Sequence, residues 1–137
     1  MFLIVCLDDN GGMMFNHRRQ SRDRVLQERI LQKTAGSVLW MTSFSARLFG
    51  PEPPEQIRVD EACLEKAGPG EYCLLESGSA AAAGDRLEGV LVCKWNRVYP
   101  ADQWFDLRLD EGGWRMTSQE EFEGSSHEKI TMEVYEK

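Results

Sequence analysis

The stretch GDRLEGVLVCKWNRVYPADQWFD (residues 84–106) decides the fold, because its character changes midway. Its apolar run, Val90–Cys93, has the composition of a strand that is buried on both faces, as at the centre of a sheet covered by helices. Residues 94–97 are polar and lead the chain towards solvent. Residues 102–106 then predict a surface loop that brings the chain back as an antiparallel neighbour. The stretch therefore predicts a mixed sheet.

Strand and helix patterns alternate before residue 86. The apolar run FLIVCL (2–7) predicts another buried strand, and the turn sequence DDNGG follows it. The apolar stripe within residues 25–31 predicts a helix, with Ser21 as its N-cap and Asp23 in its first turn. We expect further strands at 37–41, at 56–60 (an edge strand) and at 71–76, and short helices in residues 42–50, 61–68 and 77–85.

After residue 86 the apolar residues recur with a period of two. This pattern predicts strands in residues 104–109, 113–122 and 129–136, and Gly124–Ser126 suits a hairpin connection. The order of elements predicts an α/β fold, in which a mixed sheet has a parallel core, an antiparallel C-terminal hairpin and helices on both faces. The length predicts one domain, residues 1–137.

Composition narrows the class of protein. The 137 residues carry a net charge of -7, and an acidic surface disfavours binding to a phosphate backbone. The arginines of residues 18–24 are interpreted as a solvated face, so we expect no nucleic-acid partner. No segment approaches the roughly 20 apolar residues of a membrane span, and the start MFLIVCLDD lacks the basic region of a signal peptide. The sequence predicts a cytoplasmic protein with no membrane partner.

The cysteines do not predict a metal site. Cys6, Cys63, Cys73 and Cys93 form no C-x-x-C pair, and three of them lie in apolar runs, where a thiol behaves as a small hydrophobe. The chain has only two histidines, whereas a histidine-rich metal hydrolase needs several imidazoles. We therefore expect no structural metal.

The order and spacing of these segments resemble the dihydrofolate reductase family over nearly the whole chain. FLIVCLDDNGG resembles its first strand and loop, and RQSRDRVLQERI resembles its first helix. SVLWMTSFSARLFG is similar to its second strand and the helix whose N-terminus holds cofactor phosphate, and YCLLESGSA to the strand that ends in a Gly-Gly turn. GWRMTSQEEFEGSSHEKITMEVYEK resembles the final hairpin.

Several motif positions of that family differ here. The family's Gly-Arg-x-Thr cofactor motif is Met41-Thr42-Ser43-Phe44, without the arginine, and its Gly-Gly turn is Glu76-Ser77. Glycines allow a phosphate to approach the backbone closely, whereas a carboxylate at position 76 repels a diphosphate. These differences predict that NADPH, the cofactor that the resemblance implies, binds weakly or not at all.

The resemblance places Asp23 at the position of the family's ligand carboxylate, the one residue that would be catalytic in a reductase. Two adjacent N–H donors on a pterin-like ring match the two oxygens of a carboxylate. The apolar walls of such a ligand pocket would be Cys6, Leu7, Leu26 and Cys93. The alternative is that Asp23 is a solvated residue at the start of the helix, favoured by the helix dipole.

Two groups of small polar residues suit an anion or an ordinary helix cap. The first is Thr42 and Ser43, at the start of the predicted helix 42–50. The second is Ser77, Gly78 and Ser79, before the small-residue segment. Both readings remain open from the sequence, and both groups are included among the expected ligand-binding residues.

Two functions are compatible with these patterns. One is a divergent relative of dihydrofolate reductase with a degraded nicotinamide site, which binds a small heterocyclic ligand or a protein. The other is an NADPH-dependent reductase of a pterin or a related heterocycle. Fold alone does not decide between them, and the sequence leaves the oligomeric state open.

Overall fold

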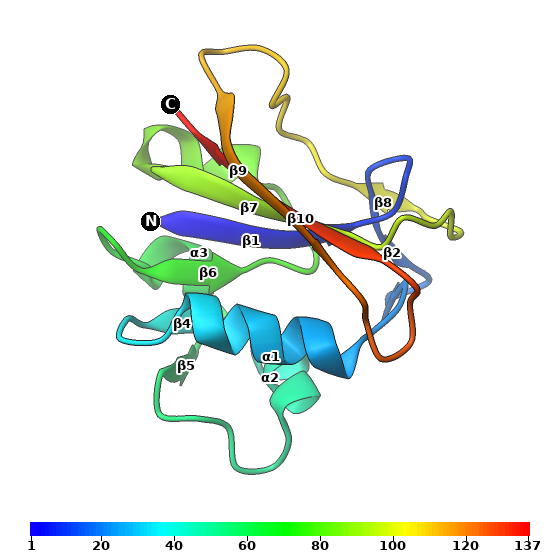
Figure 1. Cartoon of the computed structure of the whole chain (residues 1–137). Helices are drawn as coiled ribbons and strands as arrows, with labels where there is room; N and C mark the ends of the chain where they lie inside the picture. The colour runs from blue at the N-terminus through cyan, green and yellow to red at the C-terminus, as the bar shows by residue number, and fades with distance from the viewer.

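The centre of the molecule is a seven-stranded mixed sheet, seen in the computed structural model of residues 1–137 (Figure 1). Its strand order is β5-β4-β6-β1-β7-β10-β9. Strand β1 pairs in parallel with both β6 and β7, and β10 lies antiparallel between β7 and β9. The predicted parallel core with an antiparallel C-terminal hairpin is confirmed. The strands are β1 (Phe2–Leu7), β4 (Leu39–Met41), β5 (Ile57–Val59), β6 (Tyr72–Leu74), β7 (Gly89–Lys94), β9 (Arg115–Phe122) and β10 (Ile130–Glu136).

Helical segments cover both faces of this sheet. Helix α1 (Arg24–Lys33) packs on one face through Leu26 and Ile30. Helix α3 (Cys63–Lys66) and the 3₁₀ segment η2 (Ala81–Arg86) contribute to the cluster on the other face. Along β7, Val90 and Val92 belong to the cluster under α3 and η2, whereas Leu91 and Cys93 belong to the cluster under α1. This alternation explains why the run at residues 90–93 is continuously apolar: both of its faces are covered.

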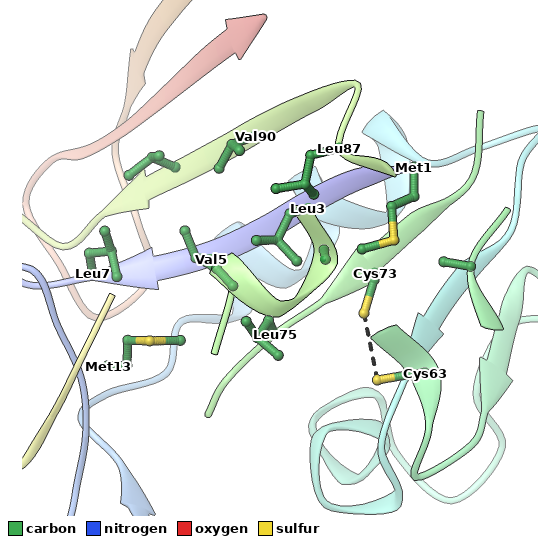
Figure 2. Close-up of a cluster of buried hydrophobic side chains, with 14 of the residues drawn as sticks. Met1, Leu3, Val5, Leu7, Met13, Cys63, Cys73, Leu75, Leu87 and Val90 are labelled. Atoms are coloured by element: carbon green, nitrogen blue, oxygen red, sulfur yellow. Dashed lines mark hydrogen bonds between the residues drawn. The ribbon is translucent and has the colours of Figure 1, made fainter. Parts of the chain in front are cut away.

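The cluster under η2 and α3 includes Leu3, Val5 and Leu7 of β1 and is called the β1 cluster (Figure 2). Leu3 and Val5 are fully buried there, next to Cys73 of β6. The Sγ atoms of Cys73 and Cys63 are 3.5 Å apart, and all four cysteines of the chain are free thiols. The cysteines thus pack as small hydrophobic residues, as the sequence predicts.

A second, three-stranded sheet has the order β3-β2-β8, from β2 (Gly12–Phe15), β3 (Arg18–Arg19) and β8 (Gln103–Trp104). The predicted strand 104–109 is therefore wrong beyond Trp104. Its period-two burial is present, because Phe105, Leu107 and Leu109 are half-buried against the β1 cluster. They have no partner strand, so alternating burial occurs here without a ladder.

Other predicted elements are shorter than expected. The pattern EGVLVCKWNRV (88–98) predicts a longer strand than β7, which stops at Lys94 because the backbone of Asn96 has a φ of 59°, outside the strand region. The predicted helix 77–85 is only the 3₁₀ segment η2, which is interrupted at Gly84 (φ 54°). The helix predicted at residues 42–50 is divided into α2 (Ser43–Ala46) and the 3₁₀ segment η1 (Arg47–Phe49). No helix of the chain has both the length and the apolar character needed to span a membrane.

Candidate functional site

Asp23 is the N-cap of α1. Its backbone is extended (φ -153°, ψ 124°), and its Oδ1 accepts hydrogen bonds from the backbone N–H groups of Val25 (2.9 Å) and Leu26 (3.2 Å). The prediction of Ser21 as N-cap is wrong by two residues. A carboxylate satisfies two of the free N–H groups of the first turn and also interacts favourably with the helix dipole, which explains the preference for Asp23.

The same carboxylate also binds the turn between β9 and β10, which lies near the start of α1 (Figure 1). Ser125 donates its backbone N–H (3.0 Å) and its hydroxyl (3.2 Å) to Oδ1. The backbone N–H of Ser126 (2.8 Å) and Nδ1 of His127 (3.0 Å) donate to Oδ2. Asp23 is 2% exposed, so the expectation of a solvated residue is wrong. Four hydrogen bonds at Oδ1 and two at Oδ2 use the acceptor capacity of the group.

Opposing effects act on the acidity of Asp23. Burial raises the pKa of its carboxyl, but the hydrogen bonds from His127 and from the backbone N–H groups of Ser125, Ser126 and Leu26 outweigh this effect. The result is a pKa well below the usual range for aspartate. Asp23 is therefore ionised and accepts hydrogen bonds only.

His127 extends this network. Its ring is 4% exposed and stacks on Trp95 with 4.6 Å between ring centroids. Its Nε2 lies 3.0 Å from the hydroxyl of Ser21 and 3.0 Å from that of Tyr99. Since ionised Asp23 only accepts, Nδ1 of His127 carries a proton. In the tautomer with its single proton on Nδ1, Nε2 is an acceptor for the hydroxyls of Ser21 and Tyr99. Three chain segments thus meet at one buried imidazole: residues 21–23, residues 95–99 and the β9–β10 turn.

A small cavity of about 30 Å³ lies beside this network. Of the residues expected around a ligand, Cys6, Asp23 and Leu26 line it. Leu7 does not, because it follows Cys6 on the strand and so packs in the cluster on the opposite face of the sheet. Cys93 is fully buried and does not line the cavity either. Pockets for drug-sized ligands typically measure about 300 Å³ or more, so a pterin-like ring does not fit here without movement.

A larger cleft of about 320 Å³ opens where β4 and β6 end. The carboxyl ends of parallel strands are the usual location of ligand sites in open α/β sheets. Thr42 lies in this cleft and caps α2, its hydroxyl accepting from the backbone N–H of Ser45 (3.3 Å). The cleft is lined by Met14, His17, Thr42, Phe44, Ser45, Glu61, Cys63, Leu74, Leu75, Glu76, Ser77 and Gln103.

The first turn of α2 already binds a carboxylate from the chain itself. Ser43 donates both its backbone N–H (3.1 Å) and its hydroxyl (2.5 Å) to Oε1 of Glu61. Thr42 and Ser43 therefore lie at a helix start as predicted, where Glu61 takes the place of an external anion.

A second carboxylate, Asp106, binds the start of η2. Its Oδ1 accepts from the backbone N–H groups of Ala80 (2.8 Å) and Ala81 (3.1 Å), and its Oδ2 accepts from the hydroxyl of Ser79 (2.5 Å). Gly78 has a φ of 92°, a value that glycine adopts readily. Ser77 faces the cleft instead. The group Ser77–Ser79 is thus divided between the cleft and a cap.

Glu76 forms an ion pair with Arg19 across the cleft wall. Nε of Arg19 lies 2.9 Å from Oε2 and its second terminal nitrogen 3.0 Å from Oε1, a two-pronged contact. The guanidinium also lies 4.3 Å from the ring centroid of Phe44. Arg19 is therefore not part of a solvated face, and it anchors β3 to the end of β6.

Sequence reasoning missed five residues of these networks: His127, Tyr99, Glu61, Asp106 and Arg19. The partners of each contact are 18 to 106 residues apart along the chain. Only the segment Gly124–His127 carried a usable signal, because small residues and a histidine in a hairpin turn can wrap around a carboxylate. No group of three or more His, Cys, Asp or Glu side chains is arranged to hold a metal ion.

Neither a family model nor a curated protein matches this chain. Among solved structures, it is similar to dihydrofolate reductase from Enterococcus faecalis, complexed with NADP(H) and RAB-propyl. The TM-score is 0.69 and the identity 12%, over 98% of this chain and 94% of that one. The chain has a dihydrofolate reductase-like fold. At this identity the likeness establishes the fold alone, and it confirms the fold class that the sequence predicts.

Proposed function

We propose that this chain is a divergent protein of dihydrofolate reductase-like fold that binds a small heterocyclic ligand in the cleft at the ends of β4 and β6, without a nicotinamide cofactor. One observation carries the proposal. The helix start that the resemblance assigns to cofactor phosphate, that of α2, is bound by Glu61 of the chain itself, and Asp106 binds the start of η2, the other segment expected to suit an anion.

Charge supports the absence of a dinucleotide. A diphosphate at the cleft would have to displace Glu61 from Ser43, and it would also approach Glu76. Like charges a few ångströms apart disfavour binding, by about 1 kcal/mol in bulk water and by more in a partly enclosed site. The charge of Arg19 is already paired with Glu76.

The lining indicates the class of ligand. Met14, Phe44, Leu74 and Leu75 supply apolar and aromatic surface, and Glu61 supplies an exposed acceptor. Such a surface suits a planar heterocycle that is neutral or cationic and carries N–H donors. A phosphorylated ligand fits it poorly.

Fluorescence titration with NADPH tests the proposal, with the four tryptophans as reporters. We expect a dissociation constant above about 100 μM for the native chain, that is, binding weaker than about -5.5 kcal/mol. Glu61→Gln should strengthen binding several-fold, because it removes the charge at α2. The matched control is Glu65→Gln, an exposed glutamate of α3 outside the cleft. Sub-micromolar binding of NADPH by the native chain would refute the proposal.

The alternative function, an NADPH-dependent reductase of a pterin, has one observation in its favour: Asp23 is buried and lines a cavity next to Cys6 and Leu26. It would require the carboxylate to release hydrogen bonds from the hairpin turn to receive a ring. Spectrophotometric assay of NADPH oxidation with dihydrofolate distinguishes the two functions. On the reductase hypothesis, Asp23→Asn weakens folate-like ligands by more than about tenfold, or about 1.4 kcal/mol.

A further inference from the structure

Ser21, His127 and Asp23 form a hydrogen-bonded chain that the proposed binding function does not use. The hydroxyl of Ser21 is 3.0 Å from Nε2 of His127, and Nδ1 of His127 is 3.0 Å from Oδ2 of Asp23. A hydroxyl, an imidazole and a carboxylate in this order are the groups of a serine hydrolase triad, which is recognised by geometry and not by sequence position. The order here is Ser21, Asp23, His127 along the chain.

The proton positions at Asp23 and His127 are those that a serine hydrolase triad requires. Asp23 is an obligate acceptor, held by the first turn of α1 and by Ser125 and Ser126, so its position does not depend on the imidazole. It fixes the proton of neutral His127 on Nδ1, which leaves Nε2 as the base. Trp95 stacks on the ring and fixes its plane. The imidazole is therefore preorganised towards Ser21.

Tyr99 completes the arrangement. Its hydroxyl also lies 3.0 Å from Nε2 of His127, and it lies 3.5 Å from Oγ of Ser21. A neutral imidazole has a single acceptor position at Nε2, so only one hydroxyl can donate to it at a time. When Ser21 donates to Nε2, the phenol of Tyr99 is left to donate to Oγ of Ser21.

Ser21 is accessible from the cavity of about 30 Å³, which it lines together with Gln20 and Arg22, and its side chain is half-exposed. The backbone N–H groups of Ser21 and Arg22 donate to no acceptor of the chain. Oε1 of Gln20 is buried and has no hydrogen-bond partner. The residues that line the cavity beside Ser21 therefore carry one unpaired acceptor and two unpaired donors. Unpaired N–H donors beside a nucleophile are the groups that an oxyanion site requires.

We propose that Ser21 is the nucleophile of an acyl-transfer site, with His127 as the general base and Asp23 as its positioning residue, and that its substrates are small carboxylic esters with a short acyl group. Oγ of Ser21 forms a bond to the acyl carbon, and its proton moves to Nε2 of His127. The bond from the acyl carbon to the alcohol oxygen breaks, and that oxygen takes the proton. Water then attacks the acyl-serine through the same base, which releases the acid and restores Ser21. The small cavity sets the limit to a short acyl group.

Covalent labelling with a fluorophosphonate tests the assignment. The expected result on the native chain is one label per molecule by intact mass, mapped to Ser21 by peptide analysis. Ser21→Ala should abolish the label, and the control Ser118→Ala, an exposed serine of β9, should keep it. No label on the native chain, or a label that survives Ser21→Ala, would overturn the proposal. Equilibrium unfolding of Ser21→Ala checks that this half-exposed position does not alter folding.

Hydrolysis of p-nitrophenyl acetate supplies a second readout. Ser21→Ala should lower kcat/KM by at least about tenfold, because the nucleophilic oxygen is removed. A rate equal in both chains would refute the nucleophile. A merely structural network would leave kcat/KM unchanged in this variant. The outcome is independent of the NADPH titration, so the two proposals fail separately.

Discussion

Two regions of the molecule each place a carboxylate on the free N–H groups of a helical segment, but they differ in their exposure to water. One is the junction of α1 with the β9–β10 turn, and the other is the cleft at the ends of β4 and β6 together with the start of η2. At the junction, Asp23 is 2% exposed, and all of its partners are groups of the protein. Glu61 at the cleft and Asp106 at the start of η2 reach across from other elements and remain exposed to solvent. Asp23 is therefore part of the core, whereas Glu61 and Asp106 are surface side chains whose hydrogen bonds water can replace.

The pKa values of Asp23 and Asp106 reflect this difference in burial. Burial raises the pKa of Asp106, but donation from Ser79 and from the N–H groups of Ala81 and Ala80 lowers it by more. The balance has the same sign as at Asp23, whose shift is far larger. Water can replace the lost partners of an exposed carboxylate but not those of a buried one, so the free-energy consequences should differ as well.

The largest expected effect is that of Asp23→Asn. The amide places N–H donors against donors of the turn, and it removes the negative charge on which the buried network depends. We expect a loss of about 3 kcal/mol or more in the free energy of unfolding, the range for breaking a buried charged network. Urea denaturation measures it, with the exposed Asp85→Asn as control. A loss below about 1 kcal/mol would show that the junction resembles the cleft after all.

The sequence predicted the sheet better than either site, and the reason is physical. Strand and helix patterns such as the run at residues 90–93 report burial of neighbouring residues, which is a local property. Ser21, Asp23 and His127 meet only because the β9–β10 turn folds back onto α1, more than 100 residues later in the chain. No periodicity encodes such a contact, so Asp23 was assigned to a helix start but its partners were not found.

The errors in predicted elements have the same origin. The alternation in residues 104–109 is real, yet it stops being a strand where β2 offers no further partner after Trp104. The strand pattern of residues 88–98 continues past β7, but the positive φ of Asn96 ends the strand. Pairing and backbone conformation depend on neighbours that the local pattern does not contain.

Acid should destabilise the junction. The folded pKa of Asp23 is depressed, so the unfolded chain binds more protons than the folded chain as the pH falls below about 4 to 5. The contribution of Asp23 is thus fully present above that range and is lost as the pH falls through it towards the folded pKa. Thermal unfolding at a series of pH values should show a midpoint that falls with acid. The fall should be smaller in Asp23→Asn, and an identical pH dependence in both chains would contradict this account.

Removing the cap of η2 should have a moderate effect. Asp106→Asn keeps one acceptor oxygen but loses the charge on the N–H groups of Ala80 and Ala81. Loss of a helix cap typically costs about 1 kcal/mol. Urea denaturation should therefore place this variant well above Asp23→Asn in stability. Asp110→Asn is the matched control, since its pair with Arg108 is 72% and 70% exposed. A loss as large as that of Asp23→Asn would remove the distinction between the two regions.

The smallest effect is expected where the hairpin touches α1 a second time, along the helix. Glu120 of β9 lies 3.2 Å from Arg29 and 3.5 Å from Lys33, and these side chains are 33%, 34% and 36% exposed. Pairs this accessible to water contribute about 0 to 1 kcal/mol and weaken with salt. Glu120→Gln should lower the free energy of unfolding by less than about 1 kcal/mol, and the difference should shrink between low and high salt. Arg29 keeps its position over Phe122, with 4.3 Å to the ring centroid, so the packing of the helix on the strand is retained. If Glu120→Gln instead lowered the free energy of unfolding as much as Asp23→Asn, the hairpin would be held mainly by contacts along α1. The position of His127 would then depend on Arg29 and Lys33 and not on the first turn of the helix.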